Sequence, residues 1–154
     1  MKPPVRDPVH FYAVAEAYGE LSNFALYPLR IRGKTWPTTE HFFQAQKFES
    51  DEDREEIRKA NSPMLAARMG RDRKRKLRSD WESVKVSIMR EALDAKFTQH
   101  AELRELLLGT GDALLVEHTE NDDFWGDGGD GSGRNELGAL LTNVRESLRS
   151  STAT

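Results

Sequence analysis

The stretch SDWESVKVSIMREALDAKFTQ, residues 79–99, has the clearest secondary-structure pattern in the chain. Its apolar residues recur on one face of a helix, and they are Val84, Ile88, Met89, Ala92 and Leu93. Ser79 and Glu82 precede this face at the spacing of a capping box, in which side chains bond the backbone N–H groups of a helix start. The pattern predicts a long helix that ends near Gln99 and a fold that is mainly helical.

Shorter patterns on both sides complete a mainly α class with a minor sheet (α+β). Ser62 and Pro63 suit the start of a helix, and Gly70 is a natural stop. Asn135 is expected to cap a last helix that carries an apolar stripe. Together, further helices are predicted over about 37–48, 51–60, 62–70, 103–109 and 135–148. Strands are predicted over Val9–Val14, Leu29–Trp36 (a hairpin that turns at Gly33-Lys34) and Ala113–Val116.

The composition is that of one globular domain in a reducing compartment. The chain has 154 residues, 37% hydrophobic and 32% charged, too few for two well-filled cores. It has no cysteine, which excludes disulfides, thiolate nucleophiles and thiolate metal sites. The mean hydropathy of -0.71 and the polar start MKPPVRDPVHFY argue against a membrane span and a signal peptide. We expect a single domain over 1–154, with a core over about 9–149, that is cytoplasmic and a monomer or weak dimer.

Charge is unevenly distributed along the chain, although the net charge is only -3. The basic run RDRKRKLR, residues 71–78, contains one acid, whereas Glu117–Asp130 contains no Lys or Arg. A basic run binds phosphates or nucleic acid, or it is simply a solvated surface. One interpretation is therefore a non-catalytic nucleic-acid-binding module, although the acidic overall balance, with a pI of about 5.8, counts against it.

The segment WPTTEHFFQAQKFE, residues 36–49, combines a helical pattern with polar chemistry. At about 100° per residue, Glu40, Gln44 and Lys47 share one helical face, with Phe43 beside them. A carboxylate, an amide and an amine thus form one strip. The alternative is a solvated face on which Glu40 and Lys47 only stabilise the helix.

The segment ENDDFWGDGGDGSGRNELG, residues 120–138, is rich in glycine and acids. Gly126–Gly131 matches G-x-G-x-x-G, but Asp127 and Asp130 would repel a pyrophosphate, and too little chain follows for a βαβ unit. We expect either a plain mobile loop, or a loop whose following helix binds one phosphate at its start, with Asp127 or Asp130 near a sugar. The histidines lack metal-ligand spacing, so no metal and no other cofactor is expected.

Taken together, these segments resemble the YbiA-like N-glycosidase family, also called the NADAR family. The resemblance covers about Phe11 to Arg149 and rests on five motifs, YGELSNF (18–24), KTWPTTEHFFQAQKF (34–48), SPMLAARMGR (62–71), DWESVK (80–85) and LVEHTENDDFWGDGGDGSGRNELG (115–138). It implies a small, mostly helical, metal-independent enzyme that hydrolyses the bond between a ribose carbon and a base nitrogen. Members similar to this chain act on phosphoribosylamino-pyrimidine intermediates of early riboflavin synthesis. Other members remove ADP-ribose from guanine bases, and a nucleotide or DNA is then the substrate.

The resemblance also implies a set of site residues. Glu40 and Trp81 occupy positions implicated in catalysis or substrate binding, and Lys47, Asp127 and residues 121–125 are added from their place in the motifs. Cleaving a ribosyl C–N bond needs a carboxylate near the sugar and a proton donor near the base. We expect Glu40 and Asp127 to be the two carboxylates, with Lys47 as an alternative proton donor or the amine of a Schiff base. Aromatic stacking, polar contacts with the base and a hold on the 5-phosphate are expected from Asn23, Phe24, Trp81, Asn121, Trp125, Arg71 and Arg134.

Overall fold

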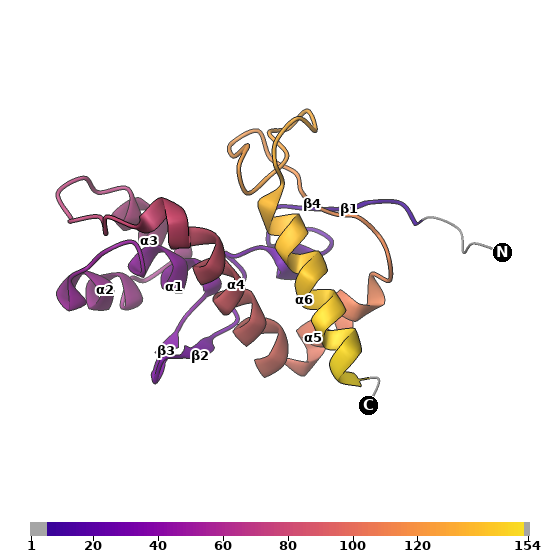
Figure 1. The fold of residues 1–154 in the computed structure, drawn as a ribbon, viewed down its shortest axis with the longest axis horizontal. Coiled ribbons are helices and arrows are strands. Elements are labelled where there is room, and N and C mark those ends of the chain that lie inside the picture. Colours follow the sequence, from indigo (N-terminus) through magenta and orange to yellow (C-terminus); the bar gives the residue numbers. More distant parts are fainter. Residues whose placement is uncertain (1–5, 153–154) are drawn as a thin grey trace. The chain divides into compact units, whose positions relative to one another are not determined.

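The computed structural model describes residues 6–152, which group into two compact units (Figure 1). One unit combines the residues up to Ser22 with those from His100 onward, and the other is Asn23–Gln99. Each unit holds one two-stranded sheet among its helices. The predicted class, mainly α with a minor sheet, is therefore confirmed. Among residues 6–152, no helix combines the length and the apolar character that crossing a bilayer requires.

The unit Asn23–Gln99 is built around helix α1 (Thr39–Ala45). Helices α2 (Asp51–Arg58), α3 (Pro63–Gly70) and α4 (Trp81–Gln99) all contact α1, as does strand β3 (Lys34–Trp36) (Figure 1). Strand β3 pairs antiparallel with β2 (Leu29–Ile31). These contacts surround α1 with other elements, and this is what buries the polar strip predicted from its sequence.

Two boundaries in this unit differ from the predicted ones. The hairpin turns at Arg32 and Gly33, which both have positive φ, one position before the predicted turn. Helix α1 ends at Ala45 instead of near Phe48. The reason is that Phe48 leaves the helix to form an antiparallel bridge with Leu77, which ties the end of α1 to the chain ahead of α4.

The start of α1 is fixed by Thr38 and His41. The Thr38 side-chain oxygen accepts from the backbone N–H of His41 over 3.1 Å and lies 2.8 Å from His41 Nδ1. His41 Nε2 lies 3.0 Å from the Ala60 carbonyl, to which it must donate, so Nδ1 accepts from the Thr38 hydroxyl. Burial lowers the pKa of His41, in keeping with this neutral tautomer.

Helix α4 runs from Trp81 to Gln99, as predicted, but the capping box does not start it. The residue before the helix is Asp80, whose carbonyl accepts from the N–H groups of Ser83 and Val84 over 3.0 and 3.2 Å. Glu82 pairs with Lys85 at 2.5 Å instead of reaching back along the chain. The predicted apolar face is correct, and its centre, Ile88, Met89, Ala92 and Leu93, is buried.

The other unit packs α6 (Glu136–Thr152) against α5 (Ala101–Gly109) and β4 (Leu115–Glu117), which pairs in parallel with β1 (Val9–Phe11) (Figure 1). A 3-10 turn spans Gly19–Leu21. The prediction that α6 follows Asn135 is correct, but the Asn135 side chain does not cap it. Its Nδ2 donates to the Leu115 carbonyl and its Oδ1 accepts from the Glu117 N–H, so it joins the start of α6 to β4.

Candidate functional site

Two of the three side chains in the predicted polar strip, Glu40 and Gln44, are buried in α1, and Lys47 is half-buried beyond its end. Glu40 is 8% exposed and Gln44 is 7% exposed. Gln44 Nε2 donates to Glu40 Oε1 over 2.7 Å, and the backbone N–H of Glu40 donates to the Asn23 carbonyl over 3.1 Å. The interpretation of this strip as a solvated face is therefore wrong, because the helices around α1 exclude water from it.

Asn23 brings a second amide to the same helix start. Its Nδ2 lies 3.6 Å from Met89 Sδ, a weak acceptor, and its Oδ1 is buried without a hydrogen-bond partner. A buried carbonyl oxygen without a donor costs free energy that a ligand N–H can recover. Phe24 follows it and is half-buried. The structure therefore brings the predicted Asn23 next to Glu40 with an acceptor available.

Lys47 lies beyond the C-terminus of α1, where its Nζ donates to the Gly70 carbonyl over 3.4 Å. Desolvation by burial lowers the pKa of Lys47; the charges of Arg71 and Lys85 act in the same direction, while that of Glu40 opposes it. Such a lysine donates a proton more readily near neutral pH, and it also supplies more free amine. Either property suits the roles predicted for it.

Trp81, at the start of α4, packs on Phe43 of α1. The two ring centroids are 5.1 Å apart with an interplanar angle of 56°, and Trp81 is only 7% exposed. The Trp81 ring is therefore packed against α1, and most of its surface is already covered. Arg71 directly follows α3 and is exposed, with its charge close enough to act on Lys47.

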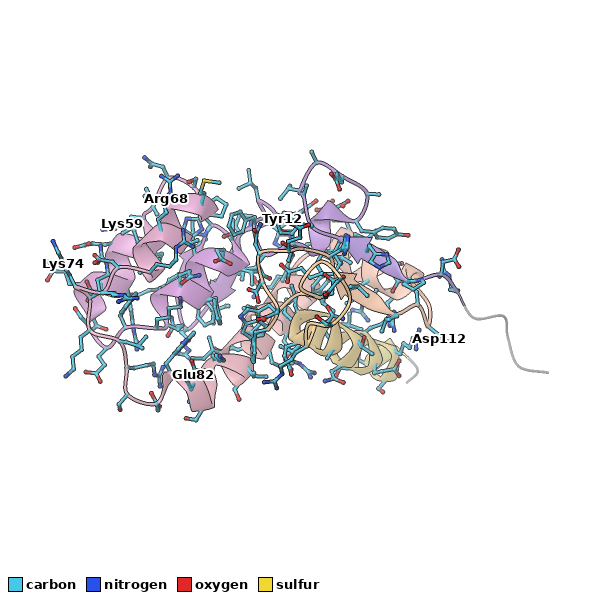
Figure 2. The ribbon with its side chains drawn as sticks, turned by 90° about the horizontal axis from the view of Figure 1, so that it is seen from above. Tyr12, Lys59, Arg68, Lys74, Glu82 and Asp112 are labelled. Atoms are coloured by element: carbon cyan, nitrogen blue, oxygen red, sulfur yellow. The ribbon has the colours of Figure 1, made fainter. Side chains whose placement is uncertain are left out.

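Half of the basic residues in the run 71–78 form ion pairs within the unit, namely Arg75, Lys76 and Arg78. Arg75 pairs with Asp53 at 2.7 Å and with Glu56 at 2.8 Å. Two further pairs in this region are Arg78 with Asp80 and Lys76 with Glu49. Figure 2 shows the Lys74 side chain at the outer edge of this unit, and Lys59 and Arg68 on its surface. Because Arg75 joins α2 to the connection between α3 and α4, the run has a structural function that the sequence did not predict.

In the other unit, Asp127 is 6% exposed and both of its carboxylate oxygens have partners. Oδ2 lies 2.8 Å from His118 Nδ1, and Oδ1 accepts from the N–H groups of Thr119 and Gly129 over 3.0 and 2.9 Å. These bonds, with that from His118 the largest contribution, lower the pKa of Asp127 to about 2. The carboxylate is therefore ionised and holds the loop together.

Hydrogen bonds connect the glycine-rich loop internally and to the start of α6. The loop rises from the N-terminal end of α6 (Figure 1). Asp122 Oδ1 accepts from the N–H groups of Phe124 and Trp125 over 2.9 and 2.8 Å. In turn, the carbonyls of Phe124 and Trp125 accept from Glu136 N and Leu137 N. The helix start that was predicted to hold a phosphate therefore uses these N–H groups to bind its own loop.

The other predicted contact residues of this unit are placed as follows. Asn121 Nδ2 donates to the Tyr12 hydroxyl over 3.3 Å, and Trp125 meets Phe124 edge to face with ring centroids 4.8 Å apart. Arg134 pairs with Glu136 at 2.8 Å and lies over the Phe124 ring. Beside the loop is a cavity of about 500 Å³, lined by Glu120, Asn121, Asp122, Asp123, Gly128, Asp130 and Ser132. Asn121 thus lines this cavity, while Asp127 holds the loop from the side of His118.

Two residues of these clusters were missed in the sequence. Gly70 signals only a helix end, although its carbonyl contacts Lys47. His118 shows no metal spacing, and its bond to Asp127 across the loop has no local pattern. Among residues 6–152, no three side chains of the metal-binding types gather into a site.

Comparison with known proteins connects both units to one family model. The NADAR domain model matches residues 10–149. The chain is 62% identical over 140 residues to N-glycosidase YbiA of Escherichia coli (strain K12), covering 91% of this chain and 88% of that protein. It is 37% identical to the riboflavin biosynthesis protein PYRR, chloroplastic, of Zea mays, covering 91% of this chain but 25% of that protein. The NMR structure of E. coli YbiA superposes with a TM-score of 0.90 at 58% identity, covering 98% of this chain and 90% of that one.

Proposed function

The chain belongs to the NADAR domain family, as its motifs predicted, and we propose that this N-glycosidase releases ribose 5-phosphate from phosphoribosylamino-pyrimidines. Like its relatives it is a hydrolase that acts on N-glycosyl bonds. The match covers a quarter of the maize relative. The name of that protein supports riboflavin intermediates as the substrate class. We infer that the chain acts as one functional domain, because the family match includes residues of both units. We also propose a cytoplasmic location, in keeping with a sequence that has no cysteine.

The observation that carries the proposal is the buried Glu40 carboxylate in the same cluster as Lys47. In the proposed hydrolysis the C1–N bond breaks, its electron pair goes to the nitrogen, and positive charge develops on C1 and the ring oxygen. The Glu40 carboxylate stabilises that charge and takes a proton from the water that attacks C1. The products are ribose 5-phosphate and the free aminopyrimidine.

Lys47 is a better proton donor to the departing nitrogen than Asp127. A carboxyl group with a pKa of about 2 carries no proton at neutral pH, whereas burial lowers the pKa of Lys47 towards that range. The function that we propose for Asp127 is to hold its loop in the shape that the substrate meets. Asp127 therefore acts in the reaction through the loop and not by proton transfer.

The proposed substrate contacts form two groups, those with the base and those with the 5-phosphate. We propose that Asn23 Oδ1, which has no internal donor, accepts from an amino group of the pyrimidine. Within Asn23–Gln99, the half-buried ring of Phe24 offers a face for stacking, and Trp81 packs on Phe43 of α1. Arg71 is a better candidate for the 5-phosphate than Arg134, which already pairs with Glu136. In the other unit, we propose Asn121 and Trp125 as further contact residues.

The activity is tested by incubating the purified chain with the 5-phosphoribosylamino-pyrimidine and following ribose 5-phosphate. We expect multiple turnovers in the presence of a chelator. ADP-ribosylated guanine, as a free nucleotide and in DNA, is assayed in parallel. If ADP-ribose is released while the pyrimidine substrate stays intact, the substrate assignment is wrong and the ADP-ribosyl hydrolase alternative replaces it. A failure to turn over any of these compounds would contradict the whole proposal.

A Schiff base on Lys47 is the second route that the site allows. The ribosylamine opens to an imine at C1, the Lys47 amine displaces the aminopyrimidine from C1, and water then hydrolyses the lysine imine. Because burial lowers the pKa of Lys47, we expect borohydride added during turnover to reduce this imine and attach the sugar phosphate to Lys47.

The adduct is located by mass spectrometry of the digested protein. Lys47→Arg keeps a cation but forms no imine, so it should lose both the label and most of the turnover. Lys85→Arg, a change of the same kind at a lysine that pairs with Glu82, should be labelled like the wild type. Full turnover by Lys47→Arg without any adduct would leave direct attack by water as the route.

A further inference from the structure

The Gln44 side chain holds the Glu40 carboxylate in one orientation. Gln44 Nε2 donates to Glu40 Oε1 over 2.7 Å, and the two residues are 7% and 8% exposed. A donor on a buried carboxylate favours its ionised form and limits its rotation. We propose that Gln44 is a positioning residue for Glu40, an inference that rests on the proposed function. Its second half is that residue 70 is a glycine because a side chain there would keep the Gln44 amide from reaching Glu40.

Gly70, the last residue of α3, lies directly against the Gln44 amide. A Cβ added to Gly70 would lie 1.9 Å from Gln44 Oε1 and 2.6 Å from its Cδ, far inside van der Waals contact. Gly70 ends a helix, and its φ lies outside the left-handed region, so its backbone conformation does not require glycine. The requirement is therefore one of space, and a side chain at this position would push the amide away from Glu40.

The Gln44 amide has only one workable orientation. Its Oε1 is buried and has no hydrogen-bond partner, and turning the amide over would bring this oxygen against the Glu40 carboxylate. The structure therefore keeps an unsatisfied carbonyl in order to present the N–H₂ group to Glu40. An apolar side chain of the same size would avoid that cost, so filling space alone does not explain an amide here.

Glu40 and Gln44 lie in a strongly charged environment. Lys47 follows the same helix. Its pKa is affected by the charge of Glu40, by that of Arg71 after α3, and by those of Glu82 and Lys85 in α4. Removing the Gln44 side-chain donor would take one hydrogen bond away from the Glu40 carboxylate. The effect of the change should therefore appear in the pH dependence of turnover as well as in its rate.

Gln44→Met and Gln44→Glu test the donor directly. Methionine keeps the length and volume of the side chain without the N–H₂ group, so kcat should fall about ten- to hundredfold, the factor for one hydrogen bond to a charged group, while KM changes little. The acid limb of its pH–rate profile should move to higher pH. Gln44→Glu should regain part of the loss as the pH is lowered, because its new carboxyl group becomes a donor once protonated.

A double-mutant cycle tests the function of Gly70. Gly70→Ala should lower kcat about as much as Gln44→Ala does, and the double variant should be no slower than Gln44→Ala alone. Gly109→Ala is the matched control, because Gly109 also ends a helix but has nothing within 4 Å of the added Cβ. It should leave turnover unchanged. The cycle does not use Gln44→Met, so it remains informative if that variant is poorly folded.

The outcomes separate this inference from the proposed function. A wild-type chain that turns over no ribosylamine overturns both. A wild-type chain that is active, with Gln44→Met showing the same kcat and the same pH profile, overturns the inference alone. Additive losses from Gly70→Ala and Gln44→Ala would assign Gly70 a separate function, such as its contact with Lys47, and would overturn the second half of the proposal.

Discussion

Glu40→Gln is expected to lower kcat by at least about a hundredfold on the ribosylamine substrate, the usual range for loss of a general base or an electrostatic stabiliser. The neutral amide can neither stabilise the charge at C1 nor take the proton of the attacking water. The shape is retained, so KM and the thermal unfolding midpoint should change far less. The measurement is steady-state release of ribose 5-phosphate, with thermal unfolding of the same preparation.

Glu52→Gln is a matched control for this change. Glu52 is the second residue of α2, as Glu40 is the second residue of α1, but it is exposed to solvent. It therefore reproduces the loss of a carboxylate near a helix start without touching the site. We expect wild-type turnover from it. If Glu40→Gln also turns over at the wild-type rate, the assignment of Glu40 as the reacting carboxylate is wrong.

Asp127→Ala should destabilise the chain by about 3 kcal/mol, because it removes the partner of three donors, two of them backbone N–H groups in the loop. Urea unfolding at neutral pH measures the difference. Because the pKa of Asp127 is lowered from 3.8 to about 2, its ionic contribution to stability is complete above pH 3.8. That contribution is lost as the pH falls towards 2, so the acid-sensitive part of the wild-type stability should be smaller in the variant.

Asp112→Ala provides the comparison within the same unit. The Asp112 side chain is 79% exposed and pairs with Arg149 at 3.0 Å, so its loss should cost less than about 1 kcal/mol. Figure 2 shows this residue on the surface of its own unit. If Asp127→Ala retains wild-type stability while turnover disappears, the chemical function predicted from the sequence holds and our structural assignment fails.

Local sequence patterns predicted the helices well but predicted poorly which hydrogen bonds and ion pairs form at their ends. The apolar face of α4 and the spacing of Glu40 and Gln44 follow from the helical repeat, so both were visible in the sequence. The capping box predicted from Ser79 and Glu82 does not form, because the Asp80 carbonyl accepts the N–H groups at the helix start and Glu82 pairs with Lys85. A capping pattern in the sequence identifies residues whose side chains can hydrogen-bond to a helix end. Which of these bonds form depends on the residues that pack against that end.

The same limit applies to the charged segments. The basic run 71–78 could be recognised as basic, but its pairing with Asp53, Glu56 and Glu49 depends on the approach of α2 and the chain beside it. The acidic loop looked mobile because glycines and aspartates dominate it. Its aspartates instead accept backbone hydrogen bonds that order it, as Asp122 and Asp127 show.

The sequence by itself determined the helical class, the family and the order of polar groups along α1, because periodicity and motif spacing are properties of neighbouring residues. Only the tertiary structure decided that Glu40 and Gln44 are buried, that Gly70 leaves room for the amide and that Asp127 is held in an ionised state. The physical reason is that desolvation and hydrogen-bond partners come from segments distant in the chain. A carboxylate acquires its chemistry from those neighbours, which no local pattern records.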